Sequence, residues 1–278
     1  MYGVRSFCVI VGSWDQQIGE IFIRNMVQKV RKCSIMAANI TKGGSPIKNR
    51  GLSQEGLKLI ACLCMLVDHI GAVFLPYHFL RIIGRLAFPI YCFFLAEGAH
   101  YTKDPRKYAL RLGVGVLLSE LPYDILFYGT FTMQDQSVML TLFIGFVMAL
   151  CMQRVKQPLL QLILAVPFAI AAEWLHTDYG GLGVGLIALF VLTRDMPYRL
   201  PIQAVTMAAI CYLMNSYSIS VLGVQVPVQM FAVFSLVPIG LYCGRKVSHS
   251  RVVQWAFYLF YPAHLLVLYI VWLLLIRL

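Results

Sequence analysis

The chain has 278 residues, of which 60% are hydrophobic and only 13% are charged, and its mean hydropathy is +0.75. A soluble domain of this size carries charge on about a quarter of its positions, so the composition excludes an ordinary soluble globule and favours a membrane protein. The formal net charge of +11 does not indicate nucleic-acid binding, because the basic residues lie in short clusters between long apolar runs. The cysteines form no CxxC pair and have no histidine at zinc spacing, so we expect no metal site.

Residues 1–50 form a basic N-terminal extension that differs from the rest of the chain. Apolar residues between Ile18 and Val30 recur at helical spacing beside basic residues, a pattern typical of a helix lying on the membrane surface. Alternatively, Met36 is the true start and the preceding residues are a mis-annotated extension. The sequence leaves both interpretations open, and we assign residues 51–278 to a transmembrane domain.

The remainder predicts an all-α bundle of about nine transmembrane helices, because a span needs about twenty apolar residues. The segments lie near 56–75, 80–99, 106–127, 138–154, 158–175, 180–193, 200–217, 228–243 and 253–276. Alternate connections contain Lys or Arg, whereas 129–137, 176–179 and 218–227 contain neither. By the positive-inside rule, this alternation predicts a multi-pass protein of the cytoplasmic membrane with its N-terminus inside and its C-terminus outside.

Ionisable residues inside these segments are the candidates for function, since a charge in the bilayer is costly. In chain order they are Asp68, His69, Arg81, Arg85, Glu120, Asp124, Glu173 and His264, with Asp178 just beyond the fifth segment and Glu97 at the inner end of the second. Similar predicted depths suggest one polar cavity in which the two arginines neutralise two of the acids. The alternative is a set of buried ion pairs that fix helix register and do no chemistry.

Several blocks resemble the TraX family in the family's own order, across about residues 52 to 270. They include Asp68-His69-Ile70-Gly71, Gly84-Arg85-Leu86-Ala87-Phe88-Pro89, Glu120-Leu121-Pro122-Tyr123-Asp124 and Tyr261-Pro262-Ala263-His264. Ser137 departs from the Asn expected in relatives, and residues 1–50 lie outside the resemblance.

The family's named member acetylates the N-terminus of conjugative pilin, so the resemblance implies a membrane acetyltransferase that uses acetyl-CoA. We then expect His69, assisted by Asp68, to be the general base, Arg85 to stabilise the oxyanion, and His264 to be a competing base or an acetyl carrier. The expected cavity residues are Arg81, Glu97, Glu120, Asp124, Glu173 and Asp178. The basic loop residues Arg106, Lys107 and Arg245 are expected to attract the CoA phosphates; alternatively, the positive-inside rule alone explains their positions.

Two other classes of function compete with this interpretation. A proton-coupled transporter would use the same acids and histidines, and a non-catalytic membrane component of a conjugation or secretion apparatus would need them only for folding. For the enzyme, the acceptor is an exported peptide such as a pilin N-terminus, or a surface glycan. The lipid bilayer is the expected environment in all three cases.

Overall fold

The structure is a computed structural model that describes residues 51–276, except 76, 215, 222, 248 and 249. The two interpretations of residues 1–50 lie outside the described residues. The α-helices are α2 (Gln54–Val73), α3 (His78–Gly84), α4 (Ala87–Tyr101), α5 (Pro105–Tyr128), α6 (Val138–Met152), α7 (Pro158–Trp174), α8 (Gly180–Thr193), α9 (Arg199–Leu213), α10 (Leu236–Gly240) and α11 (Arg251–Ile276). A 3-10 helix, η1 (Val228–Ser235), precedes α10. The all-α prediction is confirmed.

The apolar segments coincide with helices, with three departures from the predicted pattern. The eighth segment, near 228–243, is the 3-10 helix η1 followed by the short α10 and not one continuous α-helix. The second segment is divided into α3 and α4 by a turn at Arg85 and Leu86. Pro89 explains the break, because it has no N–H to donate to the Arg85 carbonyl four residues earlier. The region between α9 and η1 contains an antiparallel hairpin of β1 (Ser218–Val221) and β2 (Val224–Pro227). We had expected only a connection there.

Local signals fix several helix starts. The Ser53 side chain accepts a hydrogen bond from the N–H of Gly56 at 3.1 Å and caps α2. At the start of α5, Asp104 accepts from the N–H of Lys107 at 3.1 Å, and Pro105 occupies the first turn, where its missing N–H costs nothing.

Three helical stretches of the described residues are long and apolar enough to cross a membrane, by length and composition: Gln54–Val73, His78–Tyr101 and Val252–Leu275. Shorter apolar helices lie at Val138–Met152, Pro158–Trp174, Gly180–Thr193, Arg199–Leu213 and Val228–Gly240. Helix α5 has 24 residues but includes Arg111, Glu120 and Asp124, which lower its hydropathy.

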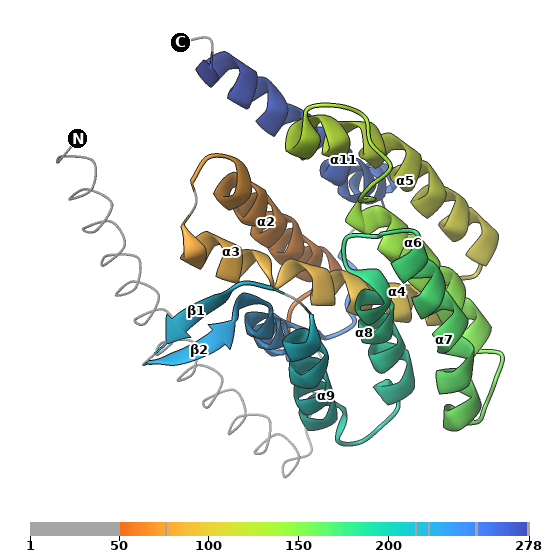
Figure 1. The fold of residues 1–278 in the computed structure, drawn as a ribbon. Helices are drawn as coiled ribbons and strands as arrows, with labels where there is room; N and C mark the ends of the chain where they lie inside the picture. The colour runs from red at the N-terminus through yellow and green to blue at the C-terminus, as the bar shows by residue number, and fades with distance from the viewer. Residues whose placement is uncertain (1–50, 76, 215, 222, 248–249, 277–278) are drawn as a thin grey trace.

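Helix α4 lies inside the bundle and contacts α2, α6 and α8 (Figure 1). Large apolar side chains cover the outer surfaces of the peripheral helices. For example, Leu117 on α5 is 78% exposed and Leu159 on α7 is 69% exposed. Water would not tolerate so much exposed apolar surface, whereas lipid would. The chain is therefore a helical membrane protein.

Helices α2 and α3 approach closely at the position of Gly84. A Cβ atom at this glycine would overlap the side chain of Asp68 on α2. The absence of a side chain thus lets α3 bring its arginines against α2. The hairpin packs on the other side of α3, where Ile219 and Val226 contact a small core of Ile82, Val228 and Phe231.

Candidate functional site

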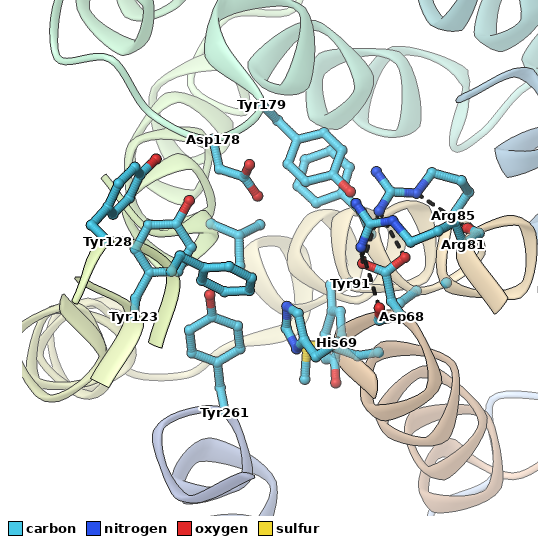
Figure 2. Close-up of a pocket in the computed structure, with 16 residues that line it drawn as sticks. Asp68, His69, Arg81, Arg85, Tyr91, Tyr123, Tyr128, Asp178, Tyr179 and Tyr261 are labelled. Atoms are coloured by element: carbon cyan, nitrogen blue, oxygen red, sulfur yellow. Dashed lines mark hydrogen bonds and ion pairs between the residues drawn. The ribbon is translucent and has the colours of Figure 1, made fainter. Parts of the chain in front are cut away.

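A polar cavity of about 370 Å³ lies where α2, α3, α4, α5 and α11 meet the connection between α7 and α8 (Figure 2). We call it the histidine cavity. Its polar lining includes Asp68, His69, Arg81, Arg85 and Asp178, together with the tyrosines Tyr91, Tyr123, Tyr128, Tyr179 and Tyr261. The structure therefore brings together residues that are widely separated in the sequence, as a shared cavity requires.

His69 on α2 and His264 on α11 form a direct hydrogen bond. His69 Nδ1 lies 2.7 Å from His264 Nε2, and His264 Nδ1 lies 2.8 Å from the backbone carbonyl oxygen of Phe260. A carbonyl oxygen only accepts, so Nδ1 of His264 must be the protonated nitrogen. In the neutral pair, Nε2 of His264 is then an acceptor, and His69 donates to it from Nδ1.

This arrangement assigns the tautomer of His69 by geometry. With its proton on Nδ1, neutral His69 has an unprotonated Nε2, which is a proton acceptor. No described residue forms a hydrogen bond with this nitrogen. His264 is only 6% exposed and uses both ring nitrogens, whereas His69 lines the cavity. Of the two imidazoles, His69 is the one placed to take a proton from a molecule in the cavity.

Asp68 is held by both arginines and forms no hydrogen bond with its neighbour His69. Nη2 of Arg85 lies 2.8 Å from each carboxylate oxygen of Asp68, and Nη1 of Arg81 lies 2.7 Å from Oδ2 (Figure 2). Arg85 also donates from Nη1 to Gln229 on η1 at 3.2 Å. The described partner of His69 is His264, so the structure places Asp68 in an ion-pair cluster beside the histidines.

Asp178 points into the cavity from the connection between α7 and α8 (Figure 2). Its carboxylate is reached by water through the cavity, although protein surrounds it. Burial raises the pKa of the Asp178 carboxyl to about 6; Arg85 opposes this shift, and Asp68 adds to it. Near neutral pH the group is therefore close enough to its pKa to exchange protons.

Three other predicted cavity acids hold backbone at this end of the bundle. Glu120 accepts from both the N–H and the hydroxyl of Ser137, at 3.2 and 3.1 Å, and so fixes the start of α6. Glu173 accepts from the N–H of Gly181 at 2.8 Å at the start of α8. Asp124 accepts from the N–H of Thr132 at 3.1 Å, and its Oδ1 has no hydrogen-bond partner among the described residues. None of these three lines the histidine cavity.

Glu97 lies away from this cavity, toward the other end of the bundle. Its Oε1 accepts from Nε of Arg194 at 3.0 Å, and both side chains are largely buried. Arg106 and Lys107, which we expected in a loop, lie in the first turn of α5, and Arg245 lies between α10 and α11. All three are exposed and line none of the described cavities. Lys107 forms an ion pair with Asp104 at 3.0 Å.

A second cavity of about 580 Å³ lies at the Glu97 end, and we call it the basic vestibule. It contains Lys58 on α2, Arg111 on α5 and Lys246 between α10 and α11. A narrow cavity of about 90 Å³, here the apolar passage, lies between vestibule and histidine cavity. It shares Met65, Tyr91, Val138 and Tyr261 with the histidine cavity, and Lys58, Phe94, Tyr108, Phe257 and Tyr258 with the vestibule. The three cavities therefore lie next to one another in series through the bundle.

Our sequence reasoning missed Lys58 and Arg111 as site residues, although both lie inside predicted spans and the cost of burying charge was a usable signal. It also missed the cavity tyrosines, because tyrosine is common in membrane helices and no pattern singles these out. Among the described residues, no group of three or more His, Cys, Asp or Glu side chains is placed to hold a metal ion.

A profile of the family described as "TraX protein" matches residues 53–272. The chain belongs to the TraX family. This confirms the resemblance read from the Asp68-His69 and Gly84-to-Pro89 blocks. The matched region contains every lining residue of the histidine cavity, the passage and the vestibule. No solved structure matches the chain.

The chain is also similar to two proteins of known name. It is 30% identical over 252 residues to "Probable fimbrial assembly protein FimC, serogroup H1" of Dichelobacter nodosus. This alignment covers 80% of this chain and 96% of that relative. It is 37% identical over 68 residues to "Uncharacterized protein RP591" of Rickettsia prowazekii (strain Madrid E), covering 24% of this chain and 27% of that protein.

Proposed function

We propose that this TraX-family protein is a membrane acetyltransferase that moves an acetyl group from acetyl-CoA to an exported acceptor. The observation that carries the proposal is the chain of hydrogen bonds in which His69 donates to His264 and His264 donates to the Phe260 carbonyl. It leaves Nε2 of His69 free to act as a general base beside a cavity of about 370 Å³. Because His69 lines this cavity, the proposed base lies where an acceptor in the cavity could reach it.

The transfer step follows from this assignment. His69 Nε2 removes the proton from an acceptor amine or hydroxyl as the acceptor's nitrogen or oxygen attacks the thioester carbonyl carbon. A C–N or C–O bond forms, and the resulting tetrahedral oxyanion collapses with cleavage of the C–S bond. His69 then returns its proton to the leaving thiolate, so the products are the acetylated acceptor and the free thiol.

Arg85 is the proposed stabiliser of the oxyanion. Its Nη2 donates to both carboxylate oxygens of Asp68, and its Nη1 donates one hydrogen to Gln229. One Nη1 hydrogen remains for a ligand oxygen, and the guanidinium is held rigidly, which favours preorganised stabilisation. In this proposal Asp68 positions Arg81 and Arg85, and His264 positions His69.

The basic connections support an orientation in which the N-terminus and the vestibule face the cytoplasm. The histidine cavity then lies toward the outer surface. Such a placement suits a donor that enters from the cytoplasm and an acceptor that is exported.

A non-catalytic role in pilus or conjugation machinery is the second candidate. It is favoured by the fimbrial assembly name of the Dichelobacter nodosus relative. In that case the ion pairs of Asp68 and the hydrogen bond of His69 would only stabilise the fold. Substitutions there would then affect function only by lowering the stability of the protein. A proton-coupled transporter is the remaining alternative, for which proton flux in empty liposomes is the discriminating measurement.

The test uses membranes from producing cells whose own copy of the gene is deleted, supplemented with purified protein and acetyl-CoA labelled in the acetyl group. We expect label to enter a membrane or surface molecule with the wild-type protein and not with His69→Gln. Folded state is monitored by melting temperature. Equal transfer by a folded His69→Gln variant, or no transfer by the wild type, would overturn the proposal.

A further inference from the structure

Among the described residues, the lining of the basic vestibule has more cations than anions. The vestibule is lined by Lys58, Arg111 and Lys246 and by two acids, Glu55 and Glu97. Glu97 is paired with Arg194 at 3.0 Å, and Glu55 accepts from the N–H of Val247 at 2.9 Å. None of the three cations forms an ion pair with a described carboxylate. A polyanion is the ligand class that such a cavity fits.

Aromatic rings hold two of these cations in place while leaving their charge available. Nζ of Lys58 lies 5.4 Å from the ring centre of Phe94 and 5.5 Å from that of Phe257. The guanidinium of Arg111 lies 5.8 Å from the ring of Tyr108 and 5.6 Å from that of Tyr258. Cation–π contacts orient a cation without supplying a counter-charge. The rings of the vestibule also offer faces on which a nucleobase can stack.

Arg111 provides the sharpest sign of a missing partner. Its Nε is buried and has no hydrogen-bond partner among the described residues. An unpaired buried donor on a charged group is costly. Because Arg111 lines the vestibule, an anion bound there would supply the counter-charge that its guanidinium lacks among the described residues.

The apolar passage lies between the basic vestibule and the histidine cavity, and the distance between these two cavities can be read from α2. Lys58 and His69 lie on the same helix, eleven positions apart, which is about 16 Å at a rise of about 1.5 Å per residue. The arm of coenzyme A from its pyrophosphate to a thioester carbonyl has about fourteen bonds, or about 16 Å at the spacing of an extended chain. The arm and the passage therefore match in length.

We propose that the basic vestibule binds the phosphorylated nucleotide end of a coenzyme A thioester, with the arm in the apolar passage and the acyl group beside His69. The inference rests on the proposed acetyltransferase function and deepens it. It assigns phosphate binding to Lys58, Arg111 and Lys246 in place of Arg106, Lys107 and Arg245, which point to solvent. The donor and acceptor thus approach one site from opposite ends of the bundle.

Binding of a non-reactive donor tests this assignment without requiring catalysis. The full-length protein in phosphatidylcholine nanodiscs is titrated with desulfo-coenzyme A and with adenosine 3′,5′-bisphosphate by calorimetry. The variants are Lys58→Gln and Arg111→Gln, with Arg111→Lys as the charge-preserving partner. Arg106→Gln is the matched control, because it removes the same charge from the exposed face of the same helix.

We expect Lys58→Gln and Arg111→Gln to weaken both ligands about ten- to hundredfold. Arg111→Lys should recover part of this loss, and Arg106→Gln should change the Kd less than threefold. Melting temperatures without ligand establish that the variants are folded.

The inference is overturned if the wild type binds neither ligand, or if Arg106→Gln weakens binding as much as Arg111→Gln. It is also overturned if the same titration in nanodiscs that contain phosphatidylglycerol shows that this anionic lipid abolishes binding of desulfo-coenzyme A. Donor binding that depends on Lys58 and Arg111 without acetyl transfer would support the vestibule and refute the transferase. Acetyl transfer that is insensitive to substitution of both residues would support the transferase and refute donor binding in the vestibule.

Discussion

Removing the charge of Asp68 should destabilise the protein strongly, because this carboxylate is the counter-charge for two arginines. Asp68→Asn preserves shape but leaves Arg81 and Arg85, whose side chains are 27% and 16% exposed, without an anion within 2.8 Å. Breaking a buried pair typically costs 3–5 kcal/mol. Water in the cavity reaches Arg81, so we expect a loss near the lower end, about 3 kcal/mol.

The measurement is the free energy of unfolding in mixed detergent micelles titrated with sodium dodecyl sulfate. Asp135→Asn is the control, since this exposed acid accepts only from the Tyr128 hydroxyl, and it should change stability by less than about 0.5 kcal/mol. Adding Arg81→Gln to Asp68→Asn should cost less than Arg81→Gln alone, because the repulsion between the arginines is relieved. If Asp68→Asn matches the Asp135 control, the ion-pair cluster does not hold α2 against α3.

Further predictions concern the Gly84 contact, the Asp178 carboxyl group and the role of His264. Gly84→Ala should lower the free energy of unfolding by about 1–3 kcal/mol, because its Cβ would overlap Asp68. The control Gly185→Ala has open space around its Cβ and should be neutral or slightly stabilising; equal effects of the two substitutions would refute the packing argument. The pKa of Asp178 is raised from 3.8 to about 6, so the folded state binds this proton more tightly than the unfolded state, and stability falls as pH rises from about 4 to 6. The melting temperature of the wild type should therefore drop more between pH 5 and pH 7 than that of Asp178→Asn. Identical drops would contradict this prediction. His264→Phe should slow acetyl transfer about ten- to hundredfold by releasing His69 while leaving the Kd for desulfo-coenzyme A unchanged, and a parallel loss of binding would show that His264 acts elsewhere.

The helices were predictable because continuous apolar runs of this length have few alternatives in a membrane. The interruption of the second span had a signal in Pro89, which predicts a kink because it lacks a backbone N–H. The proline does not specify the residues at which the chain turns, which are Arg85 and Leu86. The hairpin had a readable signal in the alternation Ser218-Ile219-Ser220-Val221 followed by Gly223, whose φ is +81°. Our focus on spans treated this stretch as a connection.

The cavity was predictable only in part, because depth in the membrane does not determine which helices are neighbours. Asp68 and His69 are adjacent in sequence, but successive helix residues point about 100° apart, which lets one face the arginines and the other face α11. The partner of His69 is 195 residues away. The acids Glu120 and Glu173 were indistinguishable from cavity residues until the helix starts that they hold were seen.

The most direct test of the account compares cells producing the wild-type protein with cells producing a folded His69→Gln variant, by mass spectrometry of intact surface and membrane molecules. If the protein transfers acetyl groups, one molecule is heavier by a single acetyl group only in the wild-type cells. The same mass for every molecule in the two strains, with both proteins present at equal levels in the membrane, would contradict it.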